Sequence, residues 1–324
     1  YNLARLFASL DHLSRGRAGW NIVTTSSPQA AQNFGLPEHP PHHERYERAR
    51  EYLDVITRLW DSWEDDAVVN DPVSGVFADT GKIHPIDHVG KHFRVRGPLN
   101  ISRTPQGRPV YVQAGSSEDG RAFAARFAEA IFTAHQTLAS AQEFYADIKR
   151  QARAFDRSPD QVKILPGISP FIASTQVETD RLQDEFNELI QPEYSLTQLR
   201  QMIGLDLSGF DLDGPFPRHL IDTDGARGVA SRFKLVVDIV DREKPTIRQL
   251  VQRLAGARGH WVIAGPPEKI ADNIQTWFEN GAADGFNVMP PWLPGGFDLF
   301  AEHVVPILRK RGLFRDEYAG TTLR

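Results

Sequence analysis

Residues 109–134, PVYVQAGSSEDGRAFAARFAEAIFTA, decide the fold class. The run from Pro109 to Gly115 is a continuous apolar strand that ends in small residues, and residues 117–128 follow it with the pattern of a helix. Residues 130–134 then form a second short apolar strand. Apolar strands that alternate with helices are typical of a parallel sheet covered by helices on both faces. This stretch therefore predicts an α/β protein.

The same alternation continues on both sides of this stretch. Upstream we expect a helix at Tyr1–Leu10 with Leu3, Leu6, Phe7 and Leu10 at helical spacing, a strand at 18–25 and an amphipathic helix at 44–60. Downstream we expect helices at 139–155, 267–280 and 297–311, and strands at 162–172 and 284–289. These five strand–helix units are compatible with an open doubly wound sheet or an eight-stranded barrel. The lack of a Gly-x-Gly-x-x-Gly turn after any strand weakens the dinucleotide-binding alternative.

Two stretches interrupt the alternation. Residues 61–106 are rich in Asp, His, Gly and Pro and predict an irregular excursion packed on the main body. Residues 175 to about 259 look mostly helical and lack a good strand, which indicates a helical insertion at about 175–255. We therefore expect a single domain over residues 1–324.

Composition narrows the classes of function. The 324 residues are 40% hydrophobic and 24% charged, which is ordinary for a globular protein with a sizeable core. A formal net charge of −5 gives no basic field for a nucleic acid or an anionic membrane. The absence of cysteine excludes disulfides, thiolate metal sites and a cysteine nucleophile. We expect a cytoplasmic enzyme with a small-molecule substrate.

Polar residues follow the first predicted strand, in the segment from Asn21 to Ser27. The carboxyl ends of barrel strands and the loops after them build the active site. The Asn21 amide can serve the edge of a heterocycle, and the hydroxyls of Thr24 and Ser26 can serve a phosphate. Local turn hydrogen bonds are the competing explanation of these hydroxyls.

The second candidate segment, His42 to Tyr46, begins the long amphipathic helix. A helix N-terminus favours an anion, and Arg45 can add a charge-assisted hydrogen bond to it. His42 and Tyr46 are four residues apart and share a face if both are helical. The alternative is that Tyr46 is a core residue and the others are solvated.

The third candidate segment runs from Gln113 to Arg121. Gly115 and Ser116 let a ligand approach the backbone closely, and Ser117 is placed as the N-cap of the next helix. A phosphate cradle and a purely structural cap are both compatible with this pattern, since Glu118 and Asp119 already complement the helix dipole.

The remaining candidates are histidines. His260 lies in the Gly-rich loop from Gly256 to His260 and can exchange protons near neutral pH, although a lone loop histidine is more often a surface residue. His84, His88 and His92 are evenly spaced, but Pro85 and Gly90 break the helical register that would align them. We expect no metal site.

Taken together, these segments resemble one family. The stretches YNLARLFASLDHLSRGRAGWNIVTT, HHERYERAREYLDVITRLWDSWEDDAVV, GVFADTGKIHPIDHVGKHFRVRGPLN, PQGRPVYVQAGSSEDGRAFAARFAEAIF and GAADGFNVMPPWLPGGFDLF are similar to bacterial luciferase-like FMN-dependent monooxygenases. The relevant branch contains nitrilotriacetate monooxygenase, the pristinamycin synthase and dibenzothiophene-sulfone monooxygenase. The insertion at about 175–255 is the one part of the chain whose similarity to this branch is loose.

This resemblance implies a luciferase-like (β/α)8 TIM barrel with a helical insertion, whose first three strands are absent from this chain. It places Asn21 and Thr24 near the isoalloxazine ring and Ser26 toward the ribityl-phosphate tail. It places His42, Arg45 and Tyr46 at the flavin tail and phosphate, with Gly115, Ser116 and Ser117 completing the cradle. His260 falls where relatives carry an active-site histidine, as a proton donor or substrate orienter.

The resemblance also implies a reaction. Reduced FMN, delivered by a separate NAD(P)H:flavin reductase, would react with O2 to give a C4a-(hydro)peroxyflavin that oxygenates a small organic substrate. Relatives form dimers or tetramers, so a homodimer or homotetramer is expected. The alternatives are an F420-dependent dehydrogenase of the same fold and a non-catalytic flavin-binding barrel. The substrate is not readable from the sequence.

Overall fold

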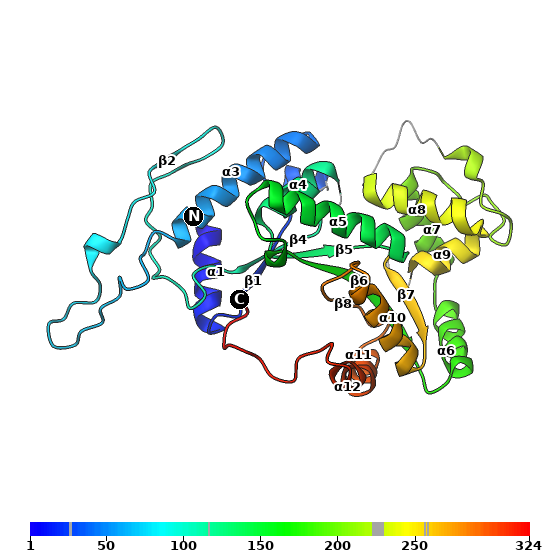
Figure 1. Ribbon diagram of the computed structural model, residues 1–324. Helices are drawn as coiled ribbons and strands as arrows, with labels where there is room; N and C mark the ends of the chain where they lie inside the picture. Colours follow the sequence, from blue (N-terminus) through cyan, green and yellow to red (C-terminus); the bar gives the residue numbers. More distant parts are fainter. Residues whose placement is uncertain (26–27, 116, 222–229, 256, 258) are drawn as a thin grey trace. The chain divides into compact units, whose positions relative to one another are not determined.

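The computed structural model describes residues 1–25, 28–115, 117–221, 230–255, 257 and 259–324 (Figure 1). The chain forms two compact units. The first comprises Tyr1–Ala114, Asp119–Ala130 and Glu317–Arg324, and the second comprises Gly115–Glu118 and Ile131–Asp316.

The first unit is built around two parallel strands and the helices that pack on them. Strand β1 (Gly19–Ile22) pairs in parallel with β4 (Val110–Gln113), and Asn21 lies opposite Val112. The helices of this unit are α1 (Asn2–Leu13), α2 (Pro28–Gln32), α3 (His42–Trp60) and α4 (Glu118–Phe127). The predicted strands at 18–25 and 109–115 and the helix after the second are therefore confirmed, with shorter strands than expected.

Helix α3 supplies much of the core of the first unit. It begins at His42, two residues before the predicted start, and ends at Trp60 as predicted. Its apolar residues Leu53, Ile56 and Trp60 are all less than 3% exposed. Three-four spacing of apolar residues thus predicted the buried face correctly, because this helix packs along its whole length.

The apolar face predicted for α1 is wrong in part. Leu6 and Leu10 are 66% and 48% exposed, whereas Ala4, Ala8 and Asp11 are fully buried. The Trp60 indole N–H donates to the backbone carbonyl of Ala4 at 2.9 Å. The carboxylate of Asp11 accepts hydrogen bonds from the Ala18 N–H at 3.2 Å and from the side chain of Gln106 at 2.6 Å. Buried hydrogen bonds, which are costly to lose, select this face over the larger apolar residues.

The excursion at 61–106 is irregular, as predicted. It contains a 3-10 turn at Thr80–Lys82 and a short antiparallel pair, β2 (His88–Val89) and β3 (Arg94–Val95). The Glu51 carboxylate on α3 accepts hydrogen bonds from the His88 ring and from two backbone N–H groups of the β2–β3 turn, at 2.8–3.0 Å. Burial would raise the pKa of Glu51, but these hydrogen bonds outweigh it and lower the pKa to about 2. The carboxylate therefore stays ionised and fastens the excursion to α3.

The second unit contains the remaining parallel strands. Strand β6 (Lys163–Ile172) lies beside β5 (Ala130–Thr133) and pairs in parallel with β7 (Trp261–Gly265) and β8 (Asn287–Val288). Its helices outside the insertion are α5 (Leu138–Ala154), α10 (Pro267–Glu279), α11 (Gly295–Leu299) and α12 (Val305–Lys310), with a π-helical turn at Phe300–Val304. Short 3-10 turns occupy Pro159–Gln161 and Arg218–Leu220.

Strand β7 was not predicted, so the expected count of five strand–helix units is wrong. The described residues contain six strands with parallel partners or neighbours: β1, β4, β5, β6, β7 and β8. The β7 sequence WVIAG is short and follows a Gly-rich loop directly. An apolar run of this length carries no periodicity of its own, and only its pairing with β6 identifies it.

The insertion is helical, as expected. Its helices are α6 (Gln176–Glu188), α7 (Pro192–Ile203), α8 (Ala230–Glu243) and α9 (Ile247–Ala255). Helices α7, α8 and α9 bury apolar side chains in a cluster of their own, which includes Leu199, Val236, Ile239 and Leu250. This segment therefore has a local core.

A buried ion pair joins the start of β6 to the segment before β8. The Lys149 ammonium on α5 lies 2.8 Å from the Asp284 carboxylate and also donates to the carbonyls of Pro159 and Val162. The same carboxylate accepts hydrogen bonds from the Tyr145 hydroxyl at 3.0 Å and the Ile164 N–H at 2.8 Å. Because each partner is satisfied, the pair fixes three segments at this end of the sheet.

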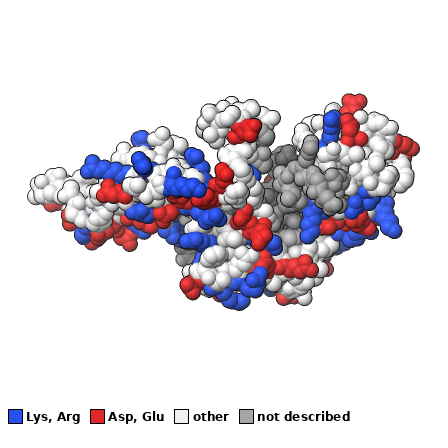
Figure 2. All heavy atoms as spheres, turned by 90° about the horizontal axis from the view of Figure 1, so that it is seen from above, with Lys and Arg blue, Asp and Glu red and all other residues white. Residues whose placement is uncertain are grey.

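Lys, Arg, Asp and Glu are interspersed over the described surface in Figure 2. On that face the described residues form no extended field of one sign. In the ranges that the structure covers, no helix is both long and apolar enough to cross a membrane.

Candidate functional site

The first group of candidate residues follows β1. Asn21 is exposed on the strand, and Thr24 beyond it is partly buried. Ser26 lies outside the described residues. Thr25 has a φ of +46°, which is unusual for a β-branched residue and places its carbonyl out of line with the strand. Backbone in this region costs energy and persists only where neighbouring groups hold it.

The Thr25 carbonyl is held by two side chains. The Arg45 guanidinium, on the first turn of α3, donates to it through Nη1, and the His39 ring contacts it at 3.3 Å. The Arg45 Nε is buried and has no hydrogen-bond partner among the described residues. A buried N–H of a charged group without a partner is costly, so this donor calls for an acceptor beyond the described residues.

His42 and Tyr46 share one face of α3, as predicted. Their ring centroids lie 4.9 Å apart, and Tyr46 packs edge-on against Phe123 at 5.8 Å. The His42 Nδ1 donates to the Asp119 carboxylate at 3.0 Å, which orients the imidazole. Tyr46 is only 5% exposed, in keeping with the alternative that it is a core residue. Asp119, taken from the sequence as complementing a helix dipole, is a partner of His42.

The third candidate segment is described in part. Gly115 is partly buried, and Ser117 is the residue directly before α4, where the sequence placed it. Ser116 lies outside the described residues. Gly115 and Ser117 belong to the second unit and the Asn21–Tyr46 group to the first. The prediction that both groups contact one flavin therefore stays a prediction.

His260 is buried, so the alternative that it is a surface residue is wrong. It is 7% exposed and directly precedes β7. Its ring stacks on Phe132 of β5 with centroids 4.8 Å apart and planes 12° apart. Gly167 of β6 makes this possible, because a Cβ there would lie 2.5 Å from the His260 Nδ1. The Gln136 amide donates to the carbonyls of Gly259 and His260 at 2.7 and 3.0 Å and fixes the loop.

A second histidine, His135, lies close to His260 and was missed in the sequence. Its ring contacts the Thr133 hydroxyl at 3.0 Å and the Ser140 hydroxyl at 3.3 Å. Burial, together with the nearby charge of His260, lowers the pKa of His135 to about 4. The His135 ring is therefore neutral at pH 7. The strand-end rule would have found it, since it follows β5 by two residues.

His135 lies just after the carboxyl end of β5, and His260, in the loop directly before β7, reaches the same end of β5 by stacking on Phe132. Phe132, on which His260 stacks, is the penultimate residue of β5. Gly167, beneath His260, is opposite Asn287 in the two-residue strand β8. The carboxyl ends of parallel strands are where α/β proteins bind ligands and place catalytic groups.

Two of the evenly spaced histidines of the excursion contact different carboxylates. His84 contacts Glu64 at 2.7 Å, and His88 contacts Glu51 at 3.0 Å. Across the described ranges, the structure contains no group of three or more His, Asp or Glu side chains that could hold a metal ion.

The geometry defines an α/β protein in which Asn21 and Thr24 lie at and after the end of β1 in the first unit, and His135 follows β5 in the second. A family model described as luciferase-like monooxygenase matches residues 1–284. The chain therefore belongs to the luciferase-like monooxygenase family, which confirms the predicted family and its α/β barrel class.

The individual relatives are monooxygenases or flavin enzymes. The chain is 51% identical to N-acetyl-S-(2-succino)cysteine monooxygenase of Bacillus subtilis (strain 168), over 100% of this chain and 73% of the relative. It is 47% identical to nitrilotriacetate monooxygenase component A of Aminobacter aminovorans, over 100% of this chain and 71% of the relative. A crystal structure of riboflavin lyase (RcaE) with modified FMN and riboflavin superposes with a TM-score of 0.86 at 35% identity, covering 100% of this chain and 70% of that one.

Proposed function

We propose that the chain is the oxygenating component of a two-component flavin monooxygenase. It would take reduced FMN from a separate NAD(P)H:flavin reductase and use O2 to oxygenate a small organic substrate. Family membership supports the monooxygenase class. The relative named component A supports the division into two components, and the structure with modified FMN supports the cofactor.

The observation that carries the flavin assignment is the donor set around Thr25. The Arg45 guanidinium is fixed by the Thr25 carbonyl, and its Nε is buried without a partner among the described residues. Arg45 also lies on the first turn of α3, where the helix dipole favours an anion. A dianionic phosphate fits both features, so the residues present fit the phosphate of FMN.

We assign the predicted site residues to parts of FMN according to the chemistry of their side chains. We assign Arg45, His42 and Tyr46 to the phosphate and tail of FMN, and Asn21 and Thr24 to the polar edge of the ring. By the family resemblance alone, we assign Gly115 and Ser117 to phosphate binding, together with Ser26 and Ser116 outside the described residues. Reduced FMN, when bound, supplies the electrons that activate O2.

His260 is the residue that we assign to the proton. It is buried, its ring is clamped by Phe132 and its backbone by Gln136. A fixed imidazole in a site that excludes water can donate a proton or hold a substrate oxygen. His135 beside it is neutral at pH 7, so it can form a hydrogen bond without bringing a positive charge into the site.

Oxygen uptake tests the proposed function. The protein is mixed with FMN, NADH and a flavin reductase, and oxygen consumption is followed with and without candidate substrates. We expect product that contains one oxygen atom from 18O2. Reduction or oxidation of F420 without oxygen uptake would establish the dehydrogenase alternative, and flavin binding with no turnover of any substrate would establish a non-catalytic barrel.

Replacing Arg45 with alanine is expected to weaken FMN binding about ten- to a hundredfold, because a hydrogen bond to a charged group contributes about 1.5–3 kcal/mol. Titration of the protein with FMN, followed by flavin fluorescence, measures this loss. Arg50→Ala, on the same helix, is the matched control and should bind FMN normally. Equal affinity in Arg45→Ala and the wild type would show that Arg45 does not hold the phosphate.

A further inference from the structure

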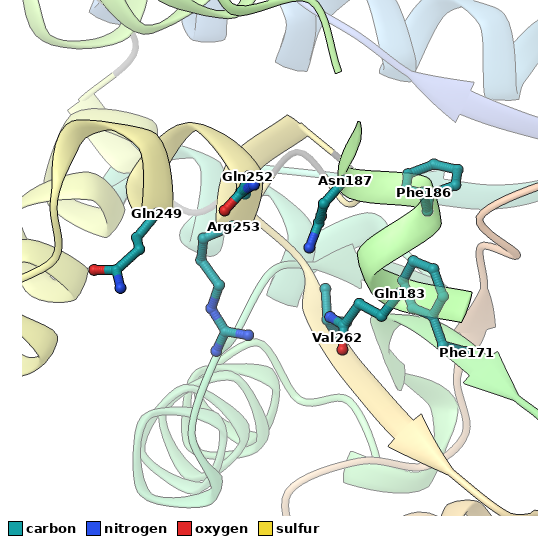
Figure 3. Close-up of a pocket in the computed structure, with 8 residues that line it drawn as sticks. All are labelled: Phe171, Gln183, Phe186, Asn187, Gln249, Gln252, Arg253 and Val262. Atoms are coloured by element: carbon teal, nitrogen blue, oxygen red, sulfur yellow. The ribbon is translucent and has the colours of Figure 1, made fainter. Parts of the chain in front are cut away.

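The insertion forms a pocket against the ends of two strands of the second unit (Figure 3). Its volume is about 180 Å³. Helices α6 and α9 form two of its walls, and β6 and β7 contribute one residue each. The lining residues are Phe171, Gln183, Phe186, Asn187, Gln249, Gln252, Arg253 and Val262.

Arg253 is the only charged residue among those lining the pocket. Its side chain is 30% exposed, and its Nε is buried without a hydrogen-bond partner among the described residues. The nearest carboxylate oxygen in an ion pair with it is that of Glu243, at 3.8 Å. That carboxylate is already bound by Arg242 at 2.6 Å. The Arg253 guanidinium therefore retains donors for an anionic ligand.

The other polar groups of the pocket are carboxamides. Figure 3 shows Arg253 extending from α9, and Gln183 and Asn187 from α6, toward the same space near Val262. The side chains of Gln183 and Asn187 make no hydrogen bond to any other described residue. Carboxamides can accept and donate, so they can surround an anion without competing with it as a carboxylate would.

An aromatic pair completes the wall. Phe171 and Phe186 meet edge to face with centroids 5.4 Å apart. Ligand pockets typically combine apolar walls with a few convergent polar groups, and drug-sized ligands occupy about 300–1,000 Å³. At about 180 Å³ this pocket is smaller, so it suits one polar end of a molecule. A planar guanidinium matches a planar carboxylate through two parallel hydrogen bonds.

The strand register relates this pocket to His260. In the β6–β7 pairing, Ser169 is opposite Val262 and Phe171 is opposite Ala264. Alternate residues of a strand share a face, so Gly167, Ser169 and Phe171 lie in a row. Gly167 is beneath His260, and Phe171 lines the pocket. At about 3.3 Å per residue, the row is about 13 Å long.

Ser169 lies in the middle of this row. It is fully buried, and its hydroxyl has no hydrogen-bond partner in the part of the chain that the structure describes. A buried hydroxyl of this kind calls for a partner from a ligand or an ordered water. Polar groups therefore lie near both ends of the row: His260 next to Gly167, and Arg253 in the pocket that Phe171 lines. The Ser169 hydroxyl lies between them.

We infer that the α6–α9 pocket binds the carboxylate end of a small carboxylic-acid substrate through Arg253. The remainder of the substrate extends along β6, past Ser169, toward His260. The inference that a carboxylate binds is drawn from the pocket alone. The inference that this ligand is then oxygenated rests on the proposed function. The inference names the substrate class: a carboxylic acid long enough to extend from the pocket along most of this row, which is about 13 Å long.

Calorimetric titration of the flavin-free protein with succinate tests the binding claim. Succinamide serves as the neutral isostere and inorganic phosphate as the other anion. We expect succinate to bind, and succinamide and phosphate to bind at least tenfold more weakly. In Arg253→Gln we expect a loss of tenfold or more in succinate affinity, since a charge-assisted hydrogen bond is removed. Arg248→Gln is the matched control, because Arg248 lies on the same helix and pairs with Asp213 at 2.7 Å.

A second variant guards against misfolding. Asn187→Asp places a carboxylate in the pocket and should abolish succinate binding while the melting temperature stays unchanged. Equal affinity for succinate and succinamide, or undiminished binding in Arg253→Gln, would overturn the inference, as would the absence of succinate binding. Equal Arg253-dependent affinity for phosphate would replace the carboxylate assignment with a general anion site. Oxygen uptake without succinate binding overturns this inference alone, and succinate binding without oxygen uptake overturns the proposed function alone.

Discussion

Replacing His260 with alanine is expected to lower coupled oxygenation by about 100-fold or more, the usual contribution of a positioned acid or base. The ring is buried at 7% exposure and stacked on Phe132, so its position relative to a bound ligand is fixed. The variant should still consume oxygen, because flavin binding is assigned to other residues, and the oxygen should appear as hydrogen peroxide. The ratio of product to peroxide is therefore the measurement.

His303→Ala is the control for this experiment, since His303 is exposed on the π-helical turn. It should leave the product-to-peroxide ratio unchanged. Because His260 is packed, thermal melting of His260→Ala must be recorded, and His260→Gln retains a polar group of similar size. Wild-type coupling in a well-folded His260→Ala protein would rule out the proton role.

Replacing Lys149 with alanine is expected to destabilise the protein by about 3–5 kcal/mol, the typical cost of removing one partner of a buried ion pair. The Lys149 side chain is 8% exposed and the Asp284 side chain 16% exposed. Without the ammonium, the Asp284 carboxylate loses its only cationic partner among the described residues, and the carbonyls of Pro159 and Val162 lose a hydrogen-bond donor. Chemical denaturation, followed by tryptophan fluorescence, gives the change in the free energy of unfolding.

Lys163→Ala is the matched control for this stability prediction. Lys163 is exposed at the first residue of β6, so its loss should change the free energy of unfolding by less than about 0.5 kcal/mol. A decrease below about 1 kcal/mol in Lys149→Ala would mean that the pair contributes no more than a surface ion pair.

Periodicity predicted the elements that pack along their whole length. Helix α3 and the strands β1, β4, β5 and β6 all occupy the predicted segments. It did not predict β7, whose five residues become a strand only by pairing with β6. It also assigned the face of α1 wrongly in part: Leu3 and Phe7 pack against the core, but the burial of Asp11 depends on Gln106, which is distant in the sequence.

The sequence indicates which residues are candidates for the site, but not which contacts those residues make in the folded protein. Strand-end position and the start of α3 indicated Asn21, Thr24 and Arg45. The positive φ of Thr25 and the unpartnered Nε of Arg45 arise from tertiary packing. The same holds for the burial of His260, since a Gly-rich loop gives no sign of the Phe132 ring that covers it. The pocket lined by Arg253 joins residues from four elements, and no local pattern indicates it.

Helix α9 has one face that packs into a core and another that lines the pocket. Leu250, Val251 and Leu254 point into the local core of the insertion, whereas Gln249, Gln252 and Arg253 line the pocket. Substitutions on the second face remove no buried apolar surface, so they cost little stability. The ligand preference that we infer for this wall can therefore be changed by substitution without altering the sheet or its histidines.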